Sequence, residues 1–139
     1  MLKPMLSIIG GLLLAFALVF ATDALFHALA PSKPPGNPSD PDAMRDYVAG
    51  QPIGLLIGLL FGWAIAAFAG SSIAVRFARR GGWPGFAVTA LFLLATTANF
   101  LIVEHPGWMV VVAVISIAGA GSLGSRTFTR AAVPKPVVG

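Results

Sequence analysis

Five polar side chains within or beside apolar stretches are the residues of this chain best suited to chemistry. Asp23 and His27 are four residues apart in the first apolar stretch, so they lie on one face of a helix, one turn apart. Asn99, Glu104 and His105 follow at the end of a later apolar stretch. Two imidazoles and two carboxylates at similar depth can ligate a divalent ion or relay protons. They can equally form hydrogen bonds between helices or reach lipid headgroups. The sequence leaves these interpretations of the candidate polar site open, and with them the question of a metal.

Catalytic machinery of a recognisable kind is missing from the rest of the sequence. The chain has no Cys and only two His, which excludes disulfides, thiolate catalysis and cysteine-based metal sites. It contains no nucleophile elbow, zincin, Walker A or dinucleotide-binding motif. We therefore expect no catalytic residues, no cofactor and no enzymatic activity.

The composition is that of an integral membrane protein. Apolar residues make up 57% of the 139 residues and charged residues 10%, against roughly 25% charged in a soluble domain. Mean hydropathy is +0.87. The net charge of +4 and the pI near 10.4 do not indicate nucleic-acid binding, because the bases sit at the ends of apolar segments rather than in a patch with interleaved aromatics. The lipid bilayer is the partner that this composition predicts.

The predicted fold is all-α, a single bundle of four transmembrane helices over residues 1–139. Each apolar stretch is long enough to cross roughly 30 Å of hydrocarbon, the last only with tilt or bilayer thinning. The spans are expected at about residues 5–29, 53–75, 84–103 and 108–123.

The segments between and after these spans have loop composition. Residues 31–47 form a proline-rich outer loop, in which Asp40 before Pro41 predicts a short helix through Tyr47. Residues 127–139 are expected to be a disordered tail. The first span ends in a sequence that resembles a signal-peptidase site, but its apolar run is longer than that of a signal peptide. We expect it to remain as an uncleaved helix.

The charges predict the orientation of the bundle. With the N-terminus in the cytoplasm, the outer segments hold only two bases, Lys33 and Arg45, and the outer half holds all five acids. The remaining bases fall in cytoplasmic segments; they are Lys3, Arg76, Arg79, Arg80, Arg126, Arg130 and Lys135. The positive-inside rule then places both termini in the cytoplasm. The membrane that we expect is the plasma (inner) membrane.

A row of small residues in the second span predicts close helix packing. Gly50, Gly54, Gly58 and Gly62 recur every fourth residue, and Gly70 continues the row, as in a glycine zipper. Such a row lets a second helix approach closely in a bilayer. We expect it to pack a helix of the same chain, and self-association through it is an additional possibility.

The loop and turn features resemble those of a family of small four-span bacterial membrane proteins to which no activity is assigned. They are Pro34-Pro35-Gly36, Pro38-Ser39-Asp40-Pro41 with Tyr47, Pro52, Asn99, His105-Pro106 and Trp108. The resemblance implies the architecture and the membrane location only. We expect a non-enzymatic membrane protein with a structural or partner-binding role. The alternative is a small transporter or proton/ion-coupled component that uses a polar site in the outer leaflet.

Overall fold

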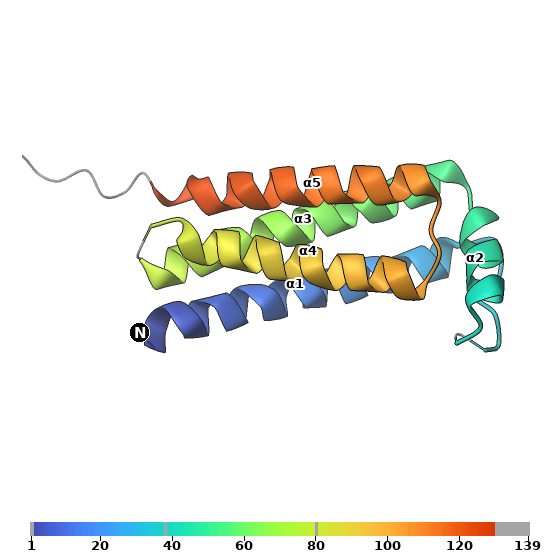
Figure 1. Ribbon diagram of the computed structural model, residues 1–139, viewed down its shortest axis with the longest axis horizontal. Helices are drawn as coiled ribbons and strands as arrows, with labels where there is room; N and C mark the ends of the chain where they lie inside the picture. The colour runs from blue at the N-terminus through green and yellow to red at the C-terminus, as the bar shows by residue number, and fades with distance from the viewer. Residues whose placement is uncertain (1, 38, 80, 130–139) are drawn as a thin grey trace, which may run out of the picture.

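The computed structural model describes residues 2–37, 39–79 and 81–129, and these residues form five helices (Figure 1). The helices are α1 (Leu2–Leu29), α2 (Pro41–Ala49), α3 (Ile53–Ala78), α4 (Trp83–Ile102) and α5 (Gly107–Thr127). All but α2 are long and apolar enough to cross a membrane, with mean hydropathies of 1.8 to 2.4 over their best windows. The predicted all-helical fold with four long apolar helices is confirmed.

The four long helices run side by side, and the short α2 lies across one end of them (Figure 1). We call this the α2 end, and the opposite end, where α1 begins and α5 finishes, the terminal end. α3 is the central helix, because it packs against α1, α4 and α5, most extensively against α1 and α5. α1 also touches α4, less extensively.

Local sequence explains where the helices begin and end. Asp40 Oδ1 accepts hydrogen bonds from the backbone N–H groups of Asp42 (3.1 Å) and Ala43 (3.3 Å), which confirms the predicted cap of α2. α5 continues through Thr127 instead of ending near Leu123. Its polar residues bond within the helix, as when Thr127 Oγ1 donates to the Leu123 carbonyl (2.9 Å), so they do not terminate it. From residue 130 onward the predicted disordered tail lies outside the described residues.

Small residues bring the helices close together at the terminal end. A Cβ built on Gly70 of α3 would lie 2.6 Å from the Gly11 carbonyl oxygen of α1, and one built on Gly11 would lie 2.5 Å from that of Gly70. Between α4 and α5, a Cβ on Gly85 would lie 2.6 Å from Ser125 Oγ. No side chain fits between these backbones, so glycine is required at the crossings.

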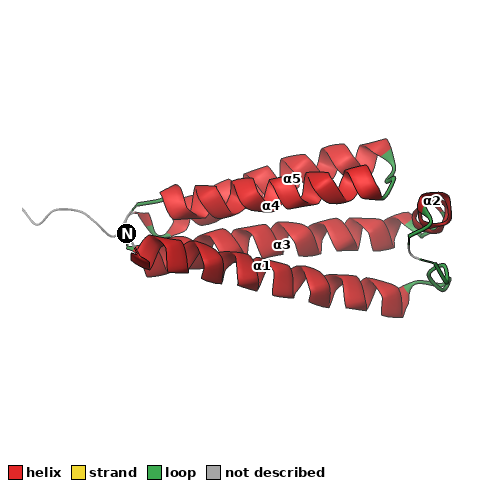
Figure 2. Ribbon diagram, turned by 60° about the horizontal axis from the view of Figure 1, so that its bottom comes forward, coloured by secondary structure: helices red, strands yellow, loops and turns green. Residues whose placement is uncertain are grey.

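Large side chains separate the helices at the α2 end. The core there is built from Leu56, Trp63, Phe92 and Met109, all at most 6% exposed, with Phe26 of α1 beside them. Figure 2 shows the α1–α3 pair and the α4–α5 pair diverging toward α2. Between the pairs, Gly124 of α5 lies against Ser71 and Ser72 of α3 toward the terminal end, whereas large side chains fill the space toward α2. This change accounts for the divergence, because the separation of packed helices follows the size of the side chains between them.

The glycine row of α3 divides into two parts. Gly62 lies against Thr22 of α1, and Gly70 lies against Gly11, so these two make close helix contacts. A Cβ on Gly54 or Gly58 would meet nothing within 4 Å, and one on Gly50 would meet only the carbonyls of α2 before it. Each four-residue step rotates 40° around the helix, so the row turns away from α1 toward its start. Inside this chain it is therefore not one continuous packing surface.

Candidate functional site

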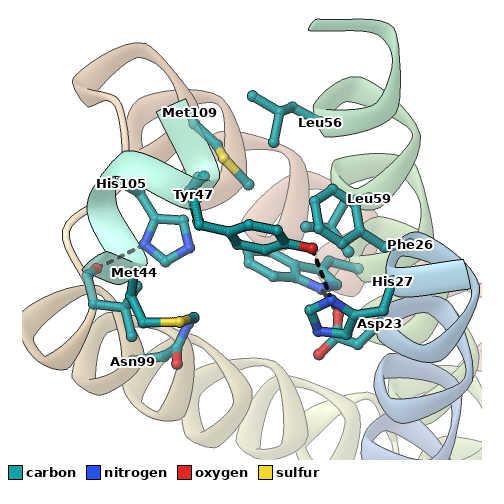
Figure 3. Close-up of a pocket in the computed structure, with 13 residues that line it drawn as sticks. Asp23, Phe26, His27, Met44, Tyr47, Leu56, Leu59, Asn99, His105 and Met109 are labelled. Atoms are coloured by element: carbon teal, nitrogen blue, oxygen red, sulfur yellow. Dashed lines mark hydrogen bonds between the residues drawn. The ribbon is translucent and has the colours of Figure 1, made fainter. Parts of the chain in front are cut away.

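A cavity of about 130 Å³ lies between the diverging helices, beneath α2 (Figure 3). We call it the α2-end cavity. Polar side chains from several elements line it, namely Asp23 and His27 of α1, Tyr47 of α2, Asn99 of α4 and His105 of the α4–α5 loop. Phe26, Trp63 and Met109 supply apolar walls. A pocket that combines an apolar wall with a few convergent polar groups is the usual form of a ligand site.

Asp23 is held in place from the central helix. Trp63 Nε1 of α3 donates a hydrogen bond to Asp23 Oδ1 at 3.3 Å. Trp63 is 6% exposed, so its indole N–H has no access to bulk solvent and needs a protein acceptor. Asp23 supplies one, and its second carboxylate oxygen makes no hydrogen bond with any described residue.

His27 is fixed by the short helix. His27 Nδ1 and the Tyr47 hydroxyl are 3.2 Å apart in a hydrogen bond in which either group can donate. The two rings also stack, with centroids 6.1 Å apart and an interplanar angle of 25°. Tyr47 is 8% exposed, because it projects from α2 into the bundle. This pair joins α1 to α2 and forms one side of the cavity.

His105 forms the opposite side of the cavity (Figure 3). Its Nδ1 lies 2.7 Å from the Val103 carbonyl oxygen, which can only accept, so Nδ1 carries the proton. In the neutral ring Nε2 is then an acceptor. Burial lowers the pKa of His105 below its ordinary value, against the smaller opposing effects of the Val103 hydrogen bond and the Asp23 charge. His105 is therefore neutral at pH 7.

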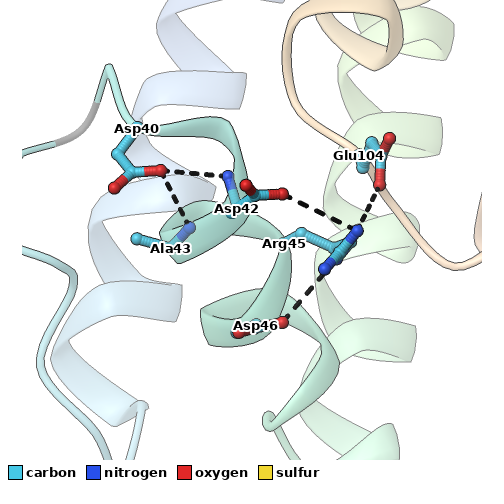
Figure 4. Close-up of polar contacts among 6 residues, drawn as sticks. All are labelled: Asp40, Asp42, Ala43, Arg45, Asp46 and Glu104. Atoms are coloured by element: carbon cyan, nitrogen blue, oxygen red, sulfur yellow. Dashed lines mark hydrogen bonds and ion pairs between the residues drawn. The ribbon is translucent and has the colours of Figure 1, made fainter.

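Polar contacts outside the cavity hold α2 over it (Figure 4). Arg45 Nη1 lies 3.3 Å from Glu104 Oε2 on the α4–α5 loop, and further ion pairs with Asp42 and Asp46 orient the guanidinium. On the other side, Gln51 Nε2 donates to Ser32 Oγ (2.8 Å) and to the Tyr47 carbonyl (3.0 Å). α2 is thus tied directly to the α4–α5 loop and, through Gln51 just beyond its end, to the α1–α2 loop.

The structure brings four of the five residues of the candidate polar site to one cavity. Asp23, His27, Asn99 and His105 line it, whereas Glu104 is exposed and pairs with Arg45. His27 and His105 lie on opposite sides, with Tyr47 between them (Figure 3). Over the described residues, no three His, Asp or Glu side chains are placed to hold a metal ion.

Two members of the site were not anticipated from the sequence. Trp63 holds Asp23, and Tyr47 holds His27. A signal for Trp63 was present, since an indole N–H in the middle of an apolar span needs an acceptor, and Asp23 is the acidic residue within the spans. Tyr47, the one tyrosine of the chain, gave no such signal, because its direction depends on how α2 folds back over the bundle.

A second, apolar cavity of about 230 Å³ adjoins the first along the α1–α4 contact. It shares Asp23, Trp63 and Asn99 with the α2-end cavity, and its remaining lining is largely apolar. That lining is Phe16, Val19, Phe20, Phe92, Ala95 and Thr96. We call it the apolar cavity. Together the two cavities form a polar compartment next to an apolar one.

Comparison with protein-family models, curated proteins and solved structures found no match to this chain. The functional assignment therefore rests on the geometry of the cavities and of the helices that form them.

Proposed function

We propose that this chain is a non-enzymatic, multi-pass protein of a plasma (inner) membrane that acts by binding, with its ligand or partner held at the α2 end. The observation that carries the proposal is the α2-end cavity, in which side chains from α1, α2, α3, α4 and the α4–α5 loop converge. Hydrogen bonds to Trp63, Tyr47 and the backbone hold three of these groups in fixed directions. Preorganised polar groups in an apolar wall are what selective binding requires.

The distribution of charge supports an orientation with both termini in the cytoplasm. The α2 end carries four acids (Asp40, Asp42, Asp46 and Glu104) against two bases (Lys33 and Arg45), whereas the charged residues described at the terminal end are all bases. Among the described residues these bases are Lys3, Arg76, Arg79 and Arg126. The positive-inside rule then places the α2 end on the outer side of the membrane.

Native mass spectrometry of the full chain, released from membrane vesicles in mild detergent, tests the binding role. We expect a discrete bound mass on the wild-type protein. Ala95→Phe fills the apolar cavity and should remove this mass, because Ala95 lines that cavity. Ala98→Phe is the matched control, since Ala98 is exposed and outside both linings. A wild-type protein free of any adduct, or an adduct that survives Ala95→Phe, would contradict the proposal.

A small transporter or proton/ion-coupled component is the second candidate. Asp23 favours it, because an ionisable side chain within a membrane span marks ion and substrate paths and here faces two imidazoles around one cavity. This candidate predicts pH-dependent flux in proteoliposomes that Asp23→Asn abolishes. Equal flux in the wild type and the Asp23→Asn variant would exclude it.

A further inference from the structure

The two cavities form one elongated site that matches an amphiphile in shape. They extend along α1 from Phe16 to His27, a rise of about 16 Å at 1.5 Å per residue. In the proposed orientation the apolar cavity lies deeper in the outer leaflet and the α2-end cavity lies near the headgroups. An amphiphile in a bilayer has the same arrangement, with its polar head near the surface and its hydrocarbon chain deeper in the leaflet. The apolar cavity lies beside the contact between α1 and α4, which is less extensive than the contacts that α3 makes with α1, α4 and α5.

The walls of the α2-end cavity favour a positively charged head. Phe26, Tyr47 and Trp63 place three aromatic rings around it, and aromatic faces attract ammonium groups. Asp23 adds a carboxylate with one oxygen free of hydrogen bonds to the described residues. Its interaction with a cation is stronger here than at a surface, because the surroundings have a low dielectric constant. Aromatic rings beside a single carboxylate are a chemical arrangement suited to an organic cation.

The hydrogen-bonding groups favour a head that donates. His105 Nδ1 is engaged with Val103, so Nε2 of the neutral ring remains as an acceptor. Asp23 Oδ2 is a second acceptor, and the Asn99 amide lines the boundary between the two cavities. A primary ammonium has three donors and satisfies such a set. A carboxylate or phosphate head would meet the Asp23 charge instead and be repelled.

We propose that these cavities bind a single-chain amphiphile whose ammonium group is joined directly to the alkyl chain. The ammonium lies between Asp23, the aromatic rings and His105, and the chain lies in the apolar cavity between Phe16 and Phe92. The ligand enters sideways from the outer leaflet between α1 and α4. This assignment rests on the proposed binding function and adds the chemical class of the ligand.

Trp63 allows the binding to be followed in the full-length protein. The chain has three tryptophans, and Trp83→Phe with Trp108→Phe leaves Trp63 as the reporter at the wall of both cavities. The detergent-solubilised protein is titrated with dodecylammonium, dodecanol or dodecanoate, which share one chain and differ in the head. We expect a saturable change in Trp63 emission with dodecylammonium and a weaker or absent one with the other two.

Asp23→Asn tests the head-group contact, because it removes the charge and keeps an oxygen for Trp63. We expect the apparent dissociation constant for dodecylammonium to rise by roughly tenfold or more, as for the loss of a hydrogen bond to a charged group. Lys33→Gln, which removes a charge from the exposed α1–α2 loop outside the cavity linings, should leave it unchanged. Helical circular dichroism of each variant checks that it is folded.

Two results would overturn the inference. Equal binding of the three probes, unaffected by Asp23→Asn, would show a site without head-group recognition and would leave the proposed binding function standing. No saturable change with dodecylammonium in the folded protein would also exclude this ligand class, and the adduct measurement above would then decide the binding function separately.

Discussion

At the scale of single residues, the contact between Asp23 and Trp63 links the candidate site to the stability of the bundle. Trp63 is buried and Asp23 is partly buried, so removal of the carboxylate leaves the indole N–H without its acceptor. We expect Trp63→Phe to lower the free energy of unfolding by about 1–3 kcal/mol. In an Asp23→Leu background the same change should lower it by much less. Denaturation of the helical circular dichroism signal in mixed micelles measures both, and additive effects would contradict the interpretation.

His105 predicts how stability depends on pH. Burial lowers its pKa in the folded protein, so between the folded value and the ordinary value of 6.5 the unfolded chain binds more protons. The contribution of a neutral His105 to the free energy of unfolding is therefore complete above about pH 6.5 and is lost as the pH falls through that window. The groups that face His105 across the cavity are Asp23, His27 and Tyr47.

The His105→Gln variant measures this contribution. Glutamine does not titrate, so the fall in denaturation midpoint between pH 7 and pH 5 should be smaller than in the wild type. His27→Gln is the comparison, since it removes the second imidazole of the same cavity. If His105→Gln leaves the pH dependence unchanged, burial of a neutral His105 does not contribute to it.

At the scale of helices, the two parts of the glycine row in α3 differ in what they tolerate. A side chain at Gly70 would meet the Gly11 backbone, which cannot move without displacing α1. We expect Gly70→Leu to destabilise the bundle by about 3 kcal/mol, the upper range for overpacking, or to prevent folding. Gly58→Leu is the matched control, because a Cβ there meets nothing within 4 Å.

Gly58→Leu also tests self-association. The surface around Gly58 is exposed in the single chain and includes Ile57 and Phe61, 43% and 66% exposed. If a second copy packs there, Gly58→Leu lowers the oligomeric state measured by light scattering without lowering the stability of the chain. An unchanged oligomeric state would leave Gly54 and Gly58 as lipid-facing residues.

At the scale of the whole molecule, the proposed orientation can be measured directly. The sequence contains no Cys, so a single introduced cysteine is the only thiol. Ser39 lies exposed at the α2 end and Thr129 lies exposed at the terminal end. With a membrane-impermeant maleimide, we expect Ser39→Cys to be labelled in intact cells. Thr129→Cys should be labelled only after permeabilisation. The reverse labelling pattern would show that the bundle has the opposite orientation.

The four long helices could be predicted from the sequence, because each is a long apolar run that is recognised without knowing its neighbours. Interactions within single helices, such as the Asp40 cap, were predicted for the same reason. The partners of α2 were not, since whether Tyr47 or Glu104 enters the cavity depends on how a short helix folds across the bundle. Which glycines of the row contact another helix could not be predicted either. Periodicity alone does not say which helix approaches Gly62 and which glycines have no neighbour.

The contact between α3 and α5 has a consequence for the protein during its synthesis. Ser71 and Ser72 of α3 are buried, and Gly124, near the end of α5, lies directly against them. α5 is the last helix to be made, so this surface of α3 lacks the cover that Gly124 provides until α5 packs against it. A chain interrupted before α5 would therefore leave uncovered a surface of α3 that the complete bundle buries.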